Sequence, residues 1–192
     1  MSFLEVVDTR QIYEGDLLSL RVDTIRAGDE TLFDKEIVEH RRSVVVVPIT
    51  DDDEVLLVRQ TRLPARKRLL EAPAGNSEKS DDSPLATAQR ELREEVGMRS
   101  NDLTRIGGQW VAPGYSTEFM DVFVARDLSD DPLPKDVDED VIVEKHAIST
   151  VPDLIRSGEI CDSMSIAVLF SALYLYPNDN QPDAGLALGN LN

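Results

Sequence analysis

Residues 83–97 have the sequence SPLATAQRELREEVG, and this stretch decides the fold class of the chain. Ser83 is suited to cap a helix, and Pro84 fits the first helical position, where its missing N–H costs nothing. Gly97 suits the left-handed residue that closes a helix. Between these ends, apolar residues recur at helical spacing, at Leu85, Ala88, Leu92 and Val96. The stretch therefore predicts a helix with one apolar face.

Strand-like segments lie on both sides of this helix. Before it, alternating or β-branched apolar residues predict strands within residues 11–27, 31–40, 44–48, 54–60 and 69–75. After it, the pattern predicts strands at 108–111, 119–125 and 141–143, a long acidic loop at 127–140, and helices at 151–157 and 163–176. Strands before and after a central helix predict a mixed sheet flanked by helices, in the α/β or α+β class.

The length of 192 residues suits one domain, or one domain with a small appendage. We expect strands of a small antiparallel sheet in residues 1–40 and the main domain in residues 41–176. Residues 177–192 are rich in Asn, Asp, Pro and Gly, which is typical of a mobile tail.

The net charge of −17 excludes nucleic acids and anionic membranes as partners, because a surface this acidic repels both. No apolar run has the length of a membrane span, and residues 1–5 lack the pattern of a signal peptide. With one cysteine, Cys161, the chain forms no internal disulfide, so we expect a cytoplasmic protein. The acidity has two interpretations, adaptation to high salt or an ordinary acidic cytosolic surface, and we favour the second.

The predicted helix carries three glutamates on one face. Glu91, Glu94 and Glu95 stand at positions i, i+3 and i+4, which are neighbours on a helix surface. Carboxylates so placed repel one another and need a compensating cation, and Mg²⁺ prefers such oxygen ligands. The plainer interpretation of such a pattern is a solvated acidic face. The residues around the glutamates favour the metal site.

Residues 90–98, RELREEVGM, resemble the R-E-U-x-E-E-x-G-U core of the Nudix box, in which U is a bulky aliphatic residue. The upstream half of the box departs from the pattern: Asp82 stands where a Glu is expected, and Gly75 is one residue too far away. The resemblance implies a Nudix α/β/α sandwich behind a small N-terminal antiparallel sheet. It also implies that Glu91, Glu94 and Glu95 bind Mg²⁺, with Mn²⁺ as an alternative.

Flanking segments resemble the ADP-ribose pyrophosphatase branch of the Nudix family. Residues 71–75, EAPAG, are similar to its E-x-P-A-G segment, which implies a metal-binding carbonyl at Ala74 and a substrate role for Glu71. Residues 58–62, VRQTR, resemble its V-R-Q-x-R strand and imply phosphate binding by Arg62 and, less directly, Arg59. Arginine suits this role because its guanidinium bonds phosphate oxygens bidentately. A strand-end surface charge is the alternative for Arg62.

Two further segments resemble the same branch. Residues 112–118, APGYSTE, are similar to its S-P-G-x-S-x-E stretch, which implies substrate roles for Pro113 and Glu118, although Pro-Gly alone indicates an ordinary turn. Residues 136–140 resemble an acidic loop that supplies a general base. Glu139 is our choice for this base, with Asp138 and Asp140 as alternatives, and a box glutamate could also serve. Trp110 and Tyr115 are candidates for stacking on adenine, although a core position is favoured for Trp110.

The resemblance implies hydrolysis of ADP-ribose to AMP and ribose 5-phosphate, with Glu94, Glu95 and Glu139 as catalytic residues. It also implies a homodimer that exchanges N-terminal strands. Alternative substrates are other nucleoside diphosphate derivatives, such as GDP-mannose or NADH. An alternative from another class of protein is a module that senses ADP-ribose without cleaving it. The intact core of the box argues against this alternative.

Overall fold

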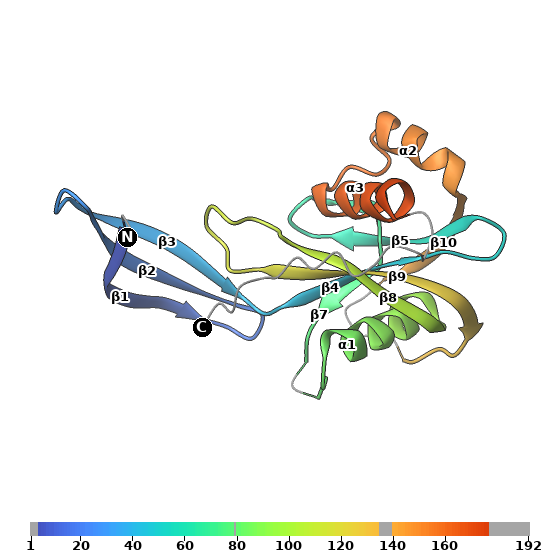
Figure 1. Ribbon diagram of the computed structural model, residues 1–192, viewed down its shortest axis with the longest axis horizontal. Coiled ribbons are helices and arrows are strands. Elements are labelled where there is room, and N and C mark those ends of the chain that lie inside the picture. The colour runs from blue at the N-terminus through green and yellow to red at the C-terminus, as the bar shows by residue number, and fades with distance from the viewer. Residues whose placement is uncertain (1–3, 79, 135–139, 177–192) are drawn as a thin grey trace. The chain divides into compact units, whose positions relative to one another are not determined.

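The computed structural model describes residues 4–78, 80–134 and 140–176 (Figure 1). The predicted tail, residues 177–192, lies outside these residues. The chain divides into two compact units. The first contains the described residues up to Arg42 together with Gln109–Met120, and the second contains Ser43–Gly108 and the described residues from Asp121 onward.

The first unit is built on an antiparallel sheet of order β1-β2-β3. Its strands are β1 (Leu4–Glu14), β2 (Leu18–Ala27) and β3 (Leu32–His40). The alternating pattern predicted a strand only from residue 11, whereas β1 begins at Leu4. Irregularities in the pairing with β2, between Val6 and Asp8 and between Gln11 and Tyr13, break the alternation that the prediction relied on.

Residues 109–120 complete the first unit beside β3. Val38 N–H donates to the Tyr115 carbonyl at 2.7 Å, and Thr117 N–H donates to the Val38 carbonyl at 2.9 Å. These bonds form a parallel bridge between Val38 and Ser116. The segment that contains Pro113 and Glu118 is therefore fixed to β3 by backbone hydrogen bonds.

The second unit contains two sheets, of order β10-β5-β6 and β7-β4-β9-β8. Their strands are β4 (Ser43–Pro48), β5 (Glu54–Arg62), β6 (Lys67–Glu71), β7 (Ala74–Asn76), β8 (Met98–Trp110), β9 (Phe119–Asp130) and β10 (Ile142–Ala147). The valines of β4 are fully buried, as a β-branched run predicts. The predicted loop at 127–140 is wrong at its start, because β9 continues to Asp130. Asp127, with a φ of 46°, interrupts the regular strand there, and of the last residues of β9 only Leu128 packs against the core, so the apolar pattern is too short to predict a strand.

Helices cover both faces of these sheets, with α1 on one side and α2 and α3 on the other (Figure 1). They are α1 (Pro84–Glu91), α2 (Val151–Ser157) and α3 (Ser163–Phe170). This arrangement confirms the predicted mixed α+β sandwich. On α1, Ala88 packs with Leu92 against Val44, Val46 and Phe123, whereas Leu85, predicted on the apolar face, is 49% exposed.

The α1 segment does not end as a regular α-helix. Ser83 caps it by accepting from Ala86 N–H, and Gly97 closes it with a φ of 79°, both as the sequence predicts. Between Leu92 and Val96, however, the chain forms a π-helical turn. Such turns are rare and are frequent at functional sites. This turn carries Glu94 and Glu95.

Candidate active site

The β6–β7 turn brings the backbone against the glutamate face of the helix. Ala74 N–H donates to Oε2 of Glu95 at 2.9 Å. A Cβ atom on Gly75 would lie 2.0 Å from the carboxyl carbon of Glu91, so only glycine leaves room for that carboxylate. Glu91 and Glu95 are buried, with 7% and 1% of their surface exposed. The structure therefore brings together Ala74 and two of the predicted metal-binding glutamates.

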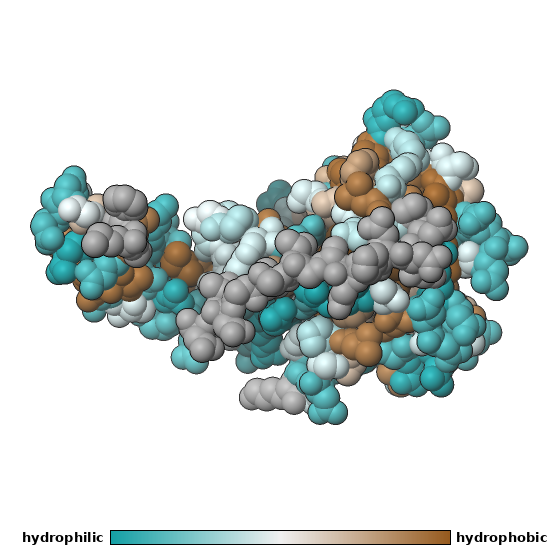
Figure 2. Space-filling view, in the orientation of Figure 1, coloured by the Kyte–Doolittle hydropathy of each residue, from teal (hydrophilic) through white to brown (hydrophobic). Residues whose placement is uncertain are grey.

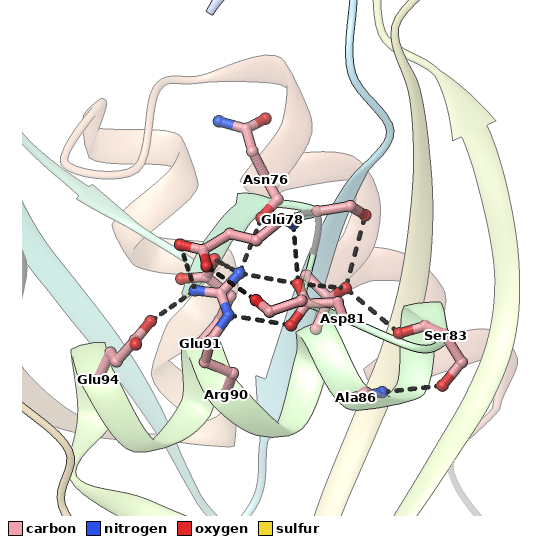
Figure 3. A network of polar contacts seen from close by, with 11 residues as sticks. Asn76, Glu78, Asp81, Ser83, Ala86, Arg90, Glu91 and Glu94 are labelled. Atoms are coloured by element: carbon pink, nitrogen blue, oxygen red, sulfur yellow. Dashed lines mark hydrogen bonds and ion pairs between the residues drawn. The ribbon is translucent and has the colours of Figure 1, made fainter.

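Arg90 is the centre of a polar network around the same helix face (Figure 3). Its Nη1 donates to Glu94 at 2.6 Å, and its Nη2 lies 2.9 Å from Glu91 and donates to the Asn76 carbonyl at 2.8 Å. Burial would lower the pKa of Arg90, but its bonds to acidic groups, Asp81 first among them, raise that pKa above its ordinary value. Arg90 is therefore permanently charged and neutralises part of the acidic cluster.

The loop before α1 contributes Asp81 to this network. Asp81 accepts from Arg90 Nη2 at 3.2 Å and from the Thr87 hydroxyl at 3.0 Å. Burial opposes ionisation here, but the bonds from Arg90, Glu78 N–H and Thr87 hold the pKa of Asp81 below its usual value. The spacing rule assigned this position to Asp82, which is instead exposed. The extra residue in the loop shifts the contact by one place along the chain.

The donor set suits a hard divalent cation, although its side chains are not gathered into a ready-made centre. Within residues 4–78, 80–134 and 140–176, no three His, Cys, Asp or Glu side chains are grouped closely enough to hold a metal ion. Glu91 and Glu94 are instead paired with Arg90. Buried carboxylates need compensating charge, and oxygen donors are what Mg²⁺ prefers. The chemistry of the residues therefore fits a divalent metal ion.

Arg62, at the end of β5, is paired with Glu71. Its Nε donates to Oε2 of Glu71 at 2.8 Å. The Arg62 side chain is 40% exposed and that of Glu71 only 4%. Burial raises the pKa of Glu71, although Arg62 acts in the opposite direction. The bond leaves the outer nitrogens of Arg62 without a partner among the described residues, so they can reach a ligand while Glu71 orients the guanidinium.

Arg59 has a different environment, which the sequence did not indicate. It points to the opposite face of β5 from Gln60 and bonds Glu144 on β10 at 2.5 Å and Glu159 at 2.5 Å. The bond to Glu144 and that to Glu159 raise the pKa of Arg59, against the effect of burial. Arg59 therefore joins β5 to β10 and to the segment between α2 and α3.

Pro113 lines a pocket of the first unit, and Glu118 follows the lining segment in the sequence. The pocket has a volume of about 290 Å³ and is lined by Arg21, Ile37, Trp110, Pro113, Tyr115, Ser116 and Thr117. Trp110 is 43% exposed and packs edge-on against Phe119, so its expected core position is wrong. The Glu118 carboxylate lies 3.9 Å from Nδ1 of His40.

Of the predicted acidic loop, residues 135–139 lie outside the described residues, and Glu139 and Asp138 are among them. Asp140 is described and is bonded to β5. Its carboxylate accepts from the Thr61 N–H and from the Thr61 hydroxyl, each at 2.8 Å. No position is therefore assigned to Glu139, whereas Asp140 has defined partners.

Comparison with known proteins places this geometry in a family. The NUDIX domain family matches residues 39–157. The chain belongs to the Nudix family. Enzymes of this family generally use divalent metal ions, in agreement with the donor set of the box. Within the described residues, no helix is both long enough and apolar enough to cross a membrane.

Two relatives and one solved structure illustrate the similarity. An ADP-ribose pyrophosphatase of Bacillus subtilis is 33% identical over 162 residues, which cover 83% of this chain and 86% of that one. A methanol dehydrogenase activator of Bacillus methanolicus is 31% identical, over 84% of this chain and 88% of that one. The crystal structure of an ADP compounds hydrolase shares the fold with a TM-score of 0.82, 23% identity and coverage of 90% and 94%. The chain is a Nudix hydrolase of the ADP-ribose pyrophosphatase-like type.

Proposed function

We propose that this Nudix hydrolase cleaves the diphosphate linkage of ADP-ribose in the presence of Mg²⁺, giving AMP and ribose 5-phosphate. The observation that carries the proposal is the close approach of the Ala74–Gly75 backbone to the buried carboxylates of Glu91 and Glu95. Such an arrangement brings a backbone turn and two buried carboxylates, whose oxygens are ligands that Mg²⁺ prefers, close together. The similarity to an ADP-ribose pyrophosphatase supports the choice of substrate.

In this proposal the Ala74 carbonyl, Glu91, Glu94 and Glu95 hold the metal. A divalent metal ion held there would supply positive charge that stabilises phosphate oxygens and would make the attacking water more acidic. Arg90 then keeps Glu91 and Glu94 in place through its bonds of 2.9 and 2.6 Å. Mn²⁺ is the alternative metal, since it shares the preference for carboxylate oxygens.

The other polar residues are assigned roles that match their surroundings. Arg62 holds the diphosphate through its outer guanidinium nitrogens, oriented by its bond to Glu71. Glu139 takes the proton of the attacking water, or a box glutamate does so in its place. Pro113 and Glu118 contribute to substrate binding. Arg59, which is engaged with Glu144 and Glu159, has a smaller role in binding than the sequence implied.

We also propose a homodimer formed through the N-terminal strands. The β1-β2-β3 sheet exposes apolar side chains that a monomer would leave in water, and Figure 2 shows such side chains on the visible face of this unit. Among the apolar residues of its three strands, the largest exposed fractions belong to Leu4, Val6, Ile12, Tyr13 and Leu32. Exposed apolar patches mark interaction surfaces. Light scattering after size-exclusion chromatography tests this proposal, and a monomer mass at micromolar concentration would contradict it.

The experiment that tests the proposed function is a substrate panel. The purified protein is incubated with Mg²⁺ and ADP-ribose, GDP-mannose or NADH in ¹⁸O water, and the products are analysed by mass spectrometry. We expect ADP-ribose to have the highest kcat/KM and ¹⁸O to enter one of the two phosphate products. Preference for GDP-mannose or NADH would reassign the substrate. Tight binding of ADP-ribose by calorimetry without any product would favour a sensing module.

A further inference from the structure

The chain immediately before β10 is bonded to β5 through a side chain. The β10–β5 pairing begins at Ile142, opposite Arg59, so two positions further in the same register Asp140 would stand opposite Thr61. There the Asp140 carboxylate accepts both the N–H and the hydroxyl of Thr61, each at 2.8 Å. The side chain thus continues the contact between the two chains to a position two pairs beyond the strand.

The third strand of the sheet takes part in the same contact. Arg68 pairs with Thr61 in the β5–β6 register, and its Nη2 donates to the Asp140 carbonyl at 2.8 Å. The same nitrogen donates to the Arg59 carbonyl at 3.3 Å and lies 3.5 Å from the Asp140 carboxylate. The three strands β10, β5 and β6 are therefore held together at one level of the sheet by the contacts among Asp140, Thr61 and Arg68. We call this set of contacts the lock.

This lock lies next to the arginine that is proposed to hold the diphosphate. Thr61 immediately precedes Arg62, and the two side chains point to opposite faces of β5. Fixing the Thr61 backbone on one face therefore fixes the Cα position of Arg62 on the other. The Glu71 contact then sets the direction of the Arg62 guanidinium. An error of about 1 Å in such a group is enough to weaken productive binding substantially.

The same bonds make Asp140 a poor general base. Both of its carboxylate oxygens accept hydrogen bonds from Thr61, and those bonds hold the pKa of Asp140 below its usual value, while burial has a smaller opposing effect. A base needs a free lone pair directed at the proton that it removes, and a pKa near the working pH. Asp140, one of the three acidic candidates in the loop, therefore has a different task.

We propose that Asp140 is a positioning residue, which with Arg68 fixes the end of β5 that carries the diphosphate-binding Arg62. The inference rests on the proposed function for the identity of the ligand, but not for the existence of the lock. Because the Asp140 side chain is 55% exposed, its loss acts locally on β5 and changes global stability little.

The test compares Asp140→Ala with the wild-type protein in steady-state kinetics on ADP-ribose with Mg²⁺. We expect KM to rise about fivefold to tenfold while kcat stays within about twofold, because binding and not chemistry is affected. The pH profile of kcat should keep its shape. Thr61→Val removes only the hydroxyl donor, so KM should rise less. The double variant should not exceed Asp140→Ala, because the two residues act through one contact.

A matched control is Asp153→Ala, which removes another carboxylate paired with an arginine. Its ion pair with Arg156 lies on α2 with both side chains 74% exposed, so KM and kcat should equal the wild-type values. A second measurement does not depend on the substrate. The Thr61 amide should exchange its hydrogen slowly in the wild-type protein and at least tenfold faster in Asp140→Ala, because its acceptor is gone.

Two outcomes would overturn the inference. A fall in kcat of about a hundredfold or more, with loss of the acidic limb of the pH profile, would make Asp140 the base. Unchanged KM together with unchanged exchange at Thr61 would make the lock irrelevant. If Asp140→Ala does not fold, the KM of Thr61→Val decides. A KM above the wild-type value supports the lock, and an unchanged KM overturns it. If the wild-type protein leaves ADP-ribose intact, the proposed function fails, while Thr61 exchange still tests the lock.

Discussion

The Asp81 carboxylate accepts a hydrogen bond of 3.2 Å from Nη2 of Arg90, and this contact joins the loop before α1 to the helix of the box glutamates. Asp81 also bonds the Glu78 N–H at 2.9 Å, which shapes the loop itself. The Asp81 side chain is 8% exposed. One aspartate therefore couples the conformation of the loop to the residue that holds Glu91 and Glu94.

The adjacent aspartates of this loop offer a matched pair of variants. Asp81→Ala should lower the free energy of unfolding by about 2 kcal/mol, because charged hydrogen bonds to Arg90 are lost. Asp82→Ala should change it by less than about 0.5 kcal/mol, because this side chain is exposed. Urea unfolding followed by circular dichroism measures both. A larger loss for Asp82→Ala would show that the spacing rule of the motif, and not the observed contact, identifies the anchor.

Much of the fold could be predicted from local signals. The Ser83 cap, the Gly97 closure and the valines of β4 each depend on chemistry within a few residues, and each is found as expected. The early start of β1 and the extension of β9 to Asp130 could not be predicted. β1 is exposed and its pairing with β2 is irregular, and the end of β9 is interrupted at Asp127, where φ is positive, so the apolar alternation on which prediction depends is incomplete.

In the candidate site, too, local features could be predicted from the sequence and long-range contacts could not. The helix spacing placed the three glutamates on one face, because that geometry is local. It could not reveal that Arg59 is bonded to Glu144 and Glu159, which are 85 and 100 residues away in sequence. Nor could it show which aspartate meets Arg90, because a single inserted residue changes the direction of a loop side chain.

Gly75→Ala tests the close approach of β7 to the box. The added Cβ would overlap the carboxylate of Glu91, which is the movable end of a side chain, so the carboxylate should shift while the fold survives. We expect kcat/KM to fall at least about tenfold, with the melting temperature lowered by only a few degrees. Gly114→Ala is the control for the unfolding measurement, because nothing lies within 4 Å of its added Cβ. Unchanged activity in Gly75→Ala would contradict the proposed metal site.

The two arginines of β5 should differ in their effect on KM. Arg62→Ala should raise KM about tenfold or more, because in the proposed site its outer nitrogens bind the diphosphate, and it should also lower the free energy of unfolding, because the buried Glu71 carboxylate loses its partner. Arg59→Ala should lower the free energy of unfolding by about 1–2 kcal/mol, because it leaves Glu144 and Glu159 without their partner, and it should change KM less. Kinetics and urea unfolding on both variants check this. A larger KM effect for Arg59→Ala would restore it as the main phosphate ligand.

Glu71 predicts a pH dependence of stability. Because burial raises its folded-state pKa, the stability that it contributes is fully present below the ordinary Glu pKa of about 4.3 and is lost as the pH rises through the folded value. Glu71→Gln should therefore gain stability relative to wild type as the pH rises above the ordinary Glu pKa. Urea unfolding at several pH values measures the difference.

Glu144→Gln is the control for Glu71→Gln, with the opposite sign. Its bond from Arg59 lowers the pKa of Glu144, so its contribution is present above the ordinary value and is lost as the pH falls. The Gln variant should therefore lose stability relative to wild type as the pH rises from the acidic range. If the stability of both variants, relative to wild type, changed in the same direction with pH, this would contradict the assignment of burial to Glu71 and of pairing with Arg59 to Glu144.

The central claim is that the box glutamates support Mg²⁺-dependent cleavage of ADP-ribose, and one measurement tests it most directly. The wild-type protein, Glu95→Gln and the control Glu54→Gln are each incubated with ADP-ribose and Mg²⁺ at low and high salt, and the products are separated by anion-exchange chromatography. We predict equal amounts of AMP and ribose 5-phosphate from wild type and Glu54→Gln, no product with a chelator, and a rate lower by about a hundredfold or more for Glu95→Gln. ADP-ribose left intact by the wild-type protein at both salt concentrations, or an undiminished rate for Glu95→Gln, would contradict the claim.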